Sequence, residues 1–159
     1  MLVRTSSDGK YIYSVDLMFL YVNQPKIHSV KIRTSKILKD LKSIGWGDPL
    51  NHRKRFSAKD VLKHPEKYPE HYERIIKADL RYPVIIDGRK DKTHYFNIID
   101  GVHRLSKAFM KKKEHVRAYI FDADLMKKFI VGKANKAGYK ATGKFTKAFI
   151  RKLFRQRFT

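Results

Sequence analysis

Cysteine is absent from the 159 residues of this chain, and three kinds of site are excluded with it. Without thiols there are no disulfides, no thiolate zinc sites and no cysteine nucleophile. Long apolar runs are missing too, since no stretch approaches the roughly 20 residues of a membrane-spanning helix. Residues Met1 to Thr5 lack the layout of a signal peptide. We therefore expect an intracellular protein, either cytoplasmic or associated with a nucleoid or nucleus.

Acidic residues are scarce. Lys and Arg number 37 against 15 Asp and Glu, which gives a formal net charge of +22. Such an excess favours polyanions, above all nucleic acid, because the bound phosphates release their counterions. Charge alone carries no base readout, so the expected contact is non-specific and most simply with DNA. Membership of a basic proteome, or contact with acidic membranes, is the alternative explanation.

No acidic residue follows Asp124, whereas residues 125–159 hold eleven Lys or Arg. Glycines at 132, 138 and 143 predict a helix, a flexible basic connector and a final amphipathic helix. The apolar face of that last helix is expected to dock on the core and leave its basic face in solvent. A nucleic-acid-binding tail or a membrane-surface tail would use the same face. The candidate nucleic-acid-binding residues are Lys136, Lys140, Lys144, Lys147, Arg151, Lys152, Arg155 and Arg157.

The remaining pattern predicts an α/β (α+β) fold, with a small mixed β-sheet flanked by helices. We expect one domain over residues 1–122 and a basic helical extension over residues 123–159. Residues 7–10 predict a hairpin turn, Ser57 and Asp60 a capping box, and residues 45–49 a loop. Residues 16–21 fit a helix or a strand. Strands are expected at 2–5, 11–14, 28–33, 83–87, 93–99 and 116–121, and helices at 35–44, 58–64, 70–77 and 104–113.

The segment from Tyr95 to Leu105 concentrates chemically competent groups. An apolar strand ends in Asp100-Gly101, and His103-Arg104 opens a helix. Free N–H groups and the positive end of the helix dipole make such a junction an anion site. Each of these residues also has a purely structural explanation. Asp100 can cap the helix, Gly101 can adopt the backbone conformation of the turn, and His103 and Arg104 can be surface groups. The candidate phosphate- or nucleotide-binding residues are Gly101, Val102, His103 and Arg104.

Phosphoryl transfer requires that the negative charge on the transferred group is neutralised and that one base is positioned beside the attacking group. Arg104 can clamp a phosphate, and His103 can donate a hydrogen bond or move a proton. Asp100 can orient an attacking hydroxyl or water, or hold Mg²⁺. Asp100 and His103 are therefore the candidate catalytic residues, with Asp79 as a possible second carboxylate facing Asp100. The other histidines show no ligand-like spacing, so no transition-metal site is expected.

Two stretches resemble the ParB/sulfiredoxin-like family: Tyr82-Pro83-Val84-Ile85-Ile86, and Ile98 to Leu105 with Ala108. The resemblance covers roughly residues 55–122. It implies a small α/β domain whose glycine–arginine turn binds nucleotide phosphates. Family members include DNA-binding partition proteins that hydrolyse a nucleotide, proteins described as nucleases, sulfiredoxins and nucleotide-driven serine kinases.

Several residues differ from the motifs of this family, and these differences narrow the range of expected activities. Val102 stands where sulfiredoxin has its cysteine, so the chain is not expected to be a sulfinic acid reductase. The glutamate of the Gly-Glu-Arg-Arg turn of partition proteins is missing, and Lys107 occupies a position that is usually alanine. The turn is most similar to the Asp-Gly-His-His-Arg turn of the serine-kinase-like members, in which the Asp is implicated in catalysis.

Two functions follow as expectations. The first is a ParB-like protein that binds nucleic acid and carries a nucleotide-binding turn, with nuclease or NTPase activity. The second is a nucleotide-dependent phosphotransferase that acts on a small hydroxylated substrate. Either would use ATP, ADP or CTP with Mg²⁺. The sequence assigns no oligomeric state.

Overall fold

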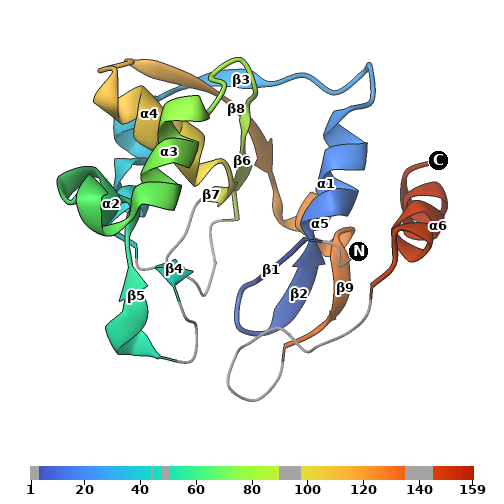
Figure 1. Ribbon diagram of the computed structural model, residues 1–159. Coiled ribbons are helices and arrows are strands. Elements are labelled where there is room, and N and C mark those ends of the chain that lie inside the picture. The colour runs from blue at the N-terminus through green and yellow to red at the C-terminus, as the bar shows by residue number, and fades with distance from the viewer. Residues whose placement is uncertain (1–3, 44, 48–50, 90–97, 135–144) are drawn as a thin grey trace. The chain divides into compact units, whose positions relative to one another are not determined.

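The computed structural model describes residues 4–43, 45–47, 51–89, 98–134 and 145–159 (Figure 1). Contacts group the chain into two compact units. Unit 1 contains residues 1–28, 87–94 and 120–159, and unit 2 contains residues 29–86 and 95–119. The N-terminal and C-terminal segments therefore belong to the same unit. The boundary expected after residue 122 stays a prediction.

Unit 2 contains most of a four-stranded sheet with the order β3-β8-β6-β7. β3 is antiparallel to β8, and β6 is antiparallel to β7. The strands are β3 (Val30–Arg33), β6 (Val84–Asp87), β7 (Ile98–Asp100) and β8 (His115–Phe121). The helices are α2 (Ala58–Lys63), α3 (Pro69–Lys77) and α4 (Val102–Met110), with the short 3₁₀ helices η1 (Thr34–Lys36) and η2 (Leu38–Lys42). The expected fold class, a small α+β fold, is confirmed.

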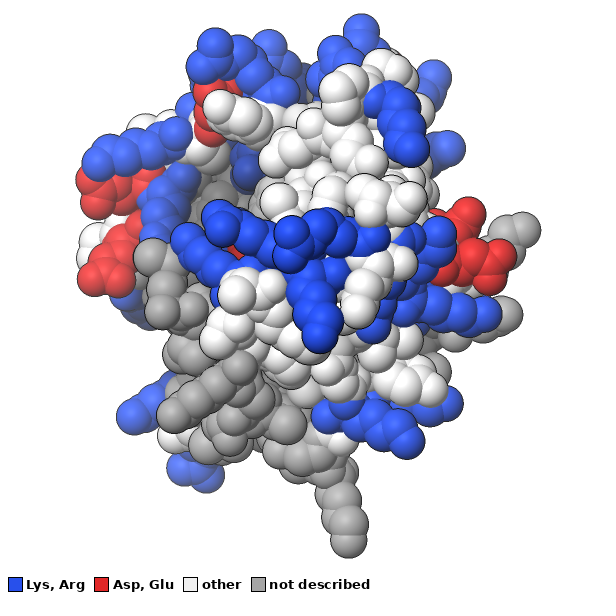
Figure 2. Space-filling model, turned by 90° about the vertical axis from the view of Figure 1, so that its right-hand side faces the viewer, with Lys and Arg blue, Asp and Glu red and all other residues white. Residues whose placement is uncertain are grey.

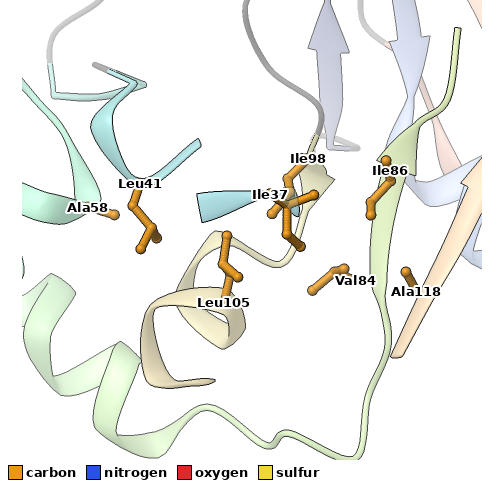
Figure 3. Packing of buried hydrophobic residues seen from close by; sticks show 8 residues of the cluster. All are labelled: Ile37, Leu41, Ala58, Val84, Ile86, Ile98, Leu105 and Ala118. Atoms are coloured by element: carbon orange, nitrogen blue, oxygen red, sulfur yellow. The ribbon is translucent and has the colours of Figure 1, made fainter. Parts of the chain in front are cut away.

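Leu105 ties α4 into the core of unit 2. Its side chain is fully buried and points toward Ile37 and Leu41 (Figure 3). Because α4 begins directly after β7, the packing of Leu105 also fixes the turn between strand and helix. The core consists of Ile37, Leu41, Ala58, Val84, Ile86, Ile98, Leu105 and Ala118.

Two helix starts follow their local sequence signals. At α2 the Asp60 N–H donates to Ser57 Oγ at 3.1 Å, and the Ser57 N–H donates to Asp60 Oδ2 at 2.8 Å. This reciprocal capping box confirms the prediction. Helix α3 begins at Pro69, where the missing N–H costs nothing. None of the helices in the described ranges is long and apolar enough to span a membrane.

Unit 1 pairs three strands in the order β1-β2-β9. These are β1 (Thr5–Ser7), β2 (Tyr11–Ser14) and β9 (Ile130–Lys133), accompanied by α1 (Val15–Val22), α5 (Ala123–Lys127) and α6 (Lys147–Phe158). The antiparallel pairing of β1 with β2 confirms the hairpin. Ile150 and Leu153 of α6 are buried, and the ring of Phe158 lies 5.1 Å from that of Tyr21. The expected docking of the apolar face of the last helix is confirmed.

Four expectations for local structure were wrong. Residues 35–44 form no continuous helix, because Ile37 turns into the core with φ −122° between η1 and η2. The loop expected at 45–49 contains β4 (Trp46–Gly47), which pairs with β5 (Arg55–Phe56). Helix α4 starts at Val102 rather than at 104, and β9 lies where only helix and connector were expected.

The structure settles one open alternative, describes one expected strand only in part and shifts the position of another. Residues 16–21 belong to a helix, α1, whose first turn is capped by Ser14. The strand expected at 93–99 is seen only as β7, because residues 93–97 lie outside the described ranges. The strand expected at 2–5 is replaced by β1 two to three residues later, and residues 2–3 are likewise outside the described ranges.

Candidate functional site

The strand-to-helix turn at residues 100–104 is built around Gly101. This residue has φ +112° and stands at the N-cap of α4, with no side chain capping the first turn. A Cβ added at this position would lie 2.6 Å from Val84 Cγ1 and 2.9 Å from Arg104 Nη2. Both the left-handed backbone and the close approach therefore require glycine. The first N–H groups of α4 remain without a side-chain cap, as an anion site requires.

Asp100 and Arg104 pair with each other across this turn. Arg104 Nη2 donates to Asp100 Oδ2 at 2.7 Å, and both side chains are mostly buried, with 21% and 23% exposure. Arg104 Nε is buried and has no hydrogen-bond partner among the described residues. The carboxylate of Asp100 thus holds the guanidinium in place, and an incoming phosphate would compete with it for the same cation.

His103 points into an aromatic cluster. Its Nε2 lies 3.2 Å from His71 Nδ1 of α3, and both imidazoles stack on Trp46, with ring centroids 4.6 Å and 4.4 Å away. Burial, together with unfavourable interactions with His71 and Arg74, lowers the pKa of His103 to about 4. Burial also lowers the pKa of His71. Both rings are therefore neutral at pH 7, with one nitrogen donating and the other accepting.

No pattern in the sequence indicated this cluster. His71 and His103 are 32 residues apart, and Trp46 lies in the segment that was expected to be a loop. Phe56 completes the neighbourhood, because its ring lies 6.2 Å from Trp46 and 5.2 Å from His71. The pairing of β4 with β5 brings the rings of Trp46 and Phe56 together.

Asp79 is engaged by Arg81 instead of standing free beside Asp100. Arg81 Nη2 donates to Asp79 Oδ2 at 2.7 Å, and the hydrogen bonds from Arg81 lower the pKa of Asp79 to about 2. Lys107 donates to the carbonyl oxygens of Ile76 and Ala78 and so caps the end of α3. Among the described residues, no group of three His, Asp or Glu side chains can hold a metal ion.

Arg104 also lines a pocket of about 220 Å³ in unit 2. Lys31 and Arg117 are opposite each other in the β3–β8 register, and both contribute to its wall. The ring of Tyr82, 63% exposed, lies beside them. No Asp or Glu is among the described lining residues, which are Lys31, Leu80, Tyr82, Val84, Arg104, Ala108, Lys113, His115, Val116 and Arg117. This basic pocket leaves no local pattern in the sequence, because its cations come from two strands, from α4 and from the loop after α4.

Helix α6 presents a basic face to solvent. Thr146 caps its first turn, with Phe149 N–H donating to Thr146 Oγ1 at 3.1 Å. Four of its five predicted cations are exposed, namely Lys147, Arg151, Lys152 and Arg155. Figure 2 looks onto the side that carries α6 and shows Lys and Arg gathered across it.

The other predicted tail residues have different placements. Arg157 donates to the carbonyl oxygens of Lys128 and Ile130 at 2.8 Å and 2.7 Å. It therefore anchors α6 to the segment at the start of β9, and its donors are partly used. Lys136, Lys140 and Lys144 lie outside the described residues.

Comparison of the chain with protein-family models, with curated proteins and with solved structures found no match.

Proposed function

We propose that this chain binds nucleic acid, most simply DNA, by non-specific contacts between phosphates and the exposed basic face of α6. The observation that carries the proposal is the arrangement of Lys147, Arg151 and Arg155. They follow one another at intervals of four residues on a helix that carries no acidic residue. Because the opposite face is buried through Ile150 and Leu153, the row is held on a fixed support.

The spacing of this row suits a phosphate backbone. A helix rises about 1.5 Å per residue, so cations four residues apart are separated by about 6 Å. Long, flexible Lys and Arg side chains bridge the difference between that interval and the phosphate spacing of a strand. The net charge of +22 adds a long-range attraction that raises the rate of encounter. The expected binding is strong at low salt, weak at high salt and indifferent to sequence.

We assign binding, and no catalytic step, to the turn at residues 100–104. The Asp100 carboxylate is held by Arg104, and His103 is a neutral ring close to His71. A weakly basic imidazole in an aromatic cluster is a poor proton acceptor at pH 7. Nuclease, nucleotide-hydrolysing or phosphotransferase activity stays a prediction from the resemblance to the ParB/sulfiredoxin-like family.

The test removes the three charges of the row, with Lys147, Arg151 and Arg155 all changed to Gln. Affinity for a duplex DNA is measured by fluorescence anisotropy at several salt concentrations. Each lost phosphate contact lowers the slope of log K against log salt by about 0.9, so we expect a slope smaller by about 2 to 3.

The matched control changes Lys26, Lys36 and Lys67 to Gln, which removes the same charge from exposed positions outside α6. We expect a clearly smaller change in slope for this variant. Equal slopes for the two variants would show that net charge alone attracts DNA, and the role of α6 would then be rejected.

A second candidate is binding of a nucleotide through its phosphates in the basic pocket beside Arg104. The pocket supports it because Lys31, Lys113 and Arg117 line it with no described carboxylate among them. Stabilisation by ATP, ADP or CTP with Mg²⁺ is measured by thermal shift. Lys31→Gln is expected to reduce the shift and Lys36→Gln to preserve it. The same shift in both variants would remove the candidate.

A further inference from the structure

A groove rimmed by lysines lies on unit 2, and its described lining includes none of residues 100–104. It has a volume of about 590 Å³ and is formed by η2, α2 and α4. We call it the lysine-rimmed groove. The lining residues are Leu38, Lys39, Leu41, Lys42, Lys59, Leu62, Lys63 and Phe109.

The groove combines an apolar lining with exposed cations. Phe109 keeps 49% of its surface exposed although it lies on a helix whose Leu105 is fully buried. Leu38 and Leu62 are half-buried, so they also offer apolar surface to a ligand. An exposed phenylalanine beside leucines is the kind of apolar patch that marks a binding surface.

The charged residues of the groove are all of one sign. Lys39, Lys42, Lys59 and Lys63 are exposed, and no Asp or Glu is among the described lining residues. None of the four forms an ion pair with another described residue. Four exposed cations, none in an ion pair with another described residue, around an apolar surface favour a ligand that is apolar on one face and acidic on the other.

We propose that the lysine-rimmed groove docks an acidic amphipathic helix of a partner protein. Leu and Phe side chains at helical spacing would lie against Phe109, Leu38 and Leu62. Glu and Asp on the flanks of the helix would meet the lysines. This proposal is independent of nucleic-acid binding by α6, which belongs to unit 1.

Three other occupants fit less well. A second copy of the chain carries a charge of +22, so the lysines would repel it. A nucleic acid backbone has phosphates for the lysines but leaves the leucines and Phe109 without apolar partners. A fatty acid brings a single carboxylate to four lysines.

The experiment uses the full chain and a fluorescent 16-residue peptide with Leu at positions i, i+3, i+4 and i+7 and Glu elsewhere. A peptide of identical composition in scrambled order is the reference, because it has the same charge without the apolar face. Binding is measured by fluorescence anisotropy. We expect the amphipathic peptide to bind at least tenfold more tightly than the scrambled one.

Substitutions locate the site. Phe109→Ala is expected to weaken peptide binding about tenfold, and Lys59→Gln with Lys63→Gln to weaken it several-fold and to flatten its salt dependence. Phe149→Ala is the matched control, because Phe149 is also an exposed phenylalanine on a helix, 38% exposed. It is expected to leave peptide affinity unchanged. If Phe109→Ala does not fold by circular dichroism, the lysine pair carries the test.

Several outcomes would overturn the proposal. Equal affinity for the two peptides would mean attraction by charge alone. If Phe109→Ala and Phe149→Ala weakened peptide binding equally, the peptide would bind outside the lysine-rimmed groove. Concentration-dependent dimerisation that Phe109→Ala abolishes would make a second copy the occupant. Loss of duplex DNA binding in the Lys59 and Lys63 variant, with peptide binding retained, would assign the groove to nucleic acid.

Discussion

At the scale of single residues, the His71–His103 pair behaves unlike ordinary surface histidines. The two rings lie against Trp46 and approach each other at 3.2 Å, which stabilises their neutral forms. A protonated ring would lose its accepting nitrogen and would sit beside Arg74. The cluster therefore couples the protonation of two side chains to the packing between α3, α4 and β4.

We expect acid to weaken this cluster. The pKa of His103 is about 4 in the folded chain, below the 6.5 of an ordinary histidine. Its contribution is therefore fully present above pH 6.5 and is lost as pH falls from 6.5 toward 4. After allowance for solvent screening of this half-buried ring, the loss between pH 7 and pH 5 is about 1 kcal/mol.

Urea denaturation at pH 7 and pH 5 measures this contribution when the wild type is compared with His103→Gln. The variant is expected to lose less stability over the interval. NMR titration of the imidazole gives an independent check. A His103 that titrates near pH 6.5 would contradict the expectation.

At the scale of elements, the β1–β2 hairpin is joined to the end of β6 by buried charges. Arg89 donates to Asp87 Oδ2 at 2.7 Å and to Asp8 Oδ2 at 3.0 Å, and all three side chains are mostly buried. Burial alone would raise the pKa of Asp8. Hydrogen bonds from Tyr11, Tyr13, Lys10 and Arg89 prevail and lower it to about 2. The carboxylate therefore organises the hairpin turn as well as the ion pair.

Removal of this carboxylate should uncouple the hairpin. Asp8→Ala leaves the Arg89 cation with one partner fewer and the turn N–H groups unpaired, so we expect a loss of about 3 kcal/mol in the free energy of unfolding. Asp124→Ala is the control, because the Asp124 side chain is 92% exposed and its contact with Lys127 is 3.5 Å long. Chemical denaturation measures both, and similar effects would show that the hairpin pairing does not depend on the buried carboxylate.

At the scale of the whole molecule, repulsion among like charges opposes folding. A net charge of +22 on 159 residues is large, and described ion pairs such as Arg4–Asp16 and Lys77–Glu73 are mostly at exposed positions, where each contributes little. Screening by salt should relieve this repulsion, because the Debye length falls to about 10 Å at 0.1 M. Polyanions should do the same at lower concentration.

We therefore expect the melting temperature to rise by about 5 °C between 10 mM and 300 mM sodium chloride. Differential scanning fluorimetry measures this change. Sodium sulfate at matched ionic strength separates screening from ion-specific effects. A melting temperature that falls with salt would mean that attractive ion pairs outweigh the net repulsion.

The elements that could be predicted from the sequence are those that short sequence patterns specify. The capping box of α2, the helix at residues 70–77 and the hairpin turn before β2 each depend on a few neighbouring residues, and each was predicted. β4 was missed because a strand of two residues is too short to show an alternating pattern. β9 was missed because it takes its identity from β2, a partner far along the chain. For the same reason the turn at Gly101 could be located, whereas the pairing of His71 with His103 and the lining of the basic pocket could not.

The pairing of β9 with β2 sets a limit on how this chain can be dissected. A fragment of residues 1–122 keeps β2 but lacks the strand that covers one of its edges. The uncovered donors and acceptors would then template association with other fragments. Aggregation of such a fragment would reflect the cut rather than a property of the intact chain. The basic C-terminal segment is thus not a detachable tail, and its role is better tested by replacing side chains than by truncation.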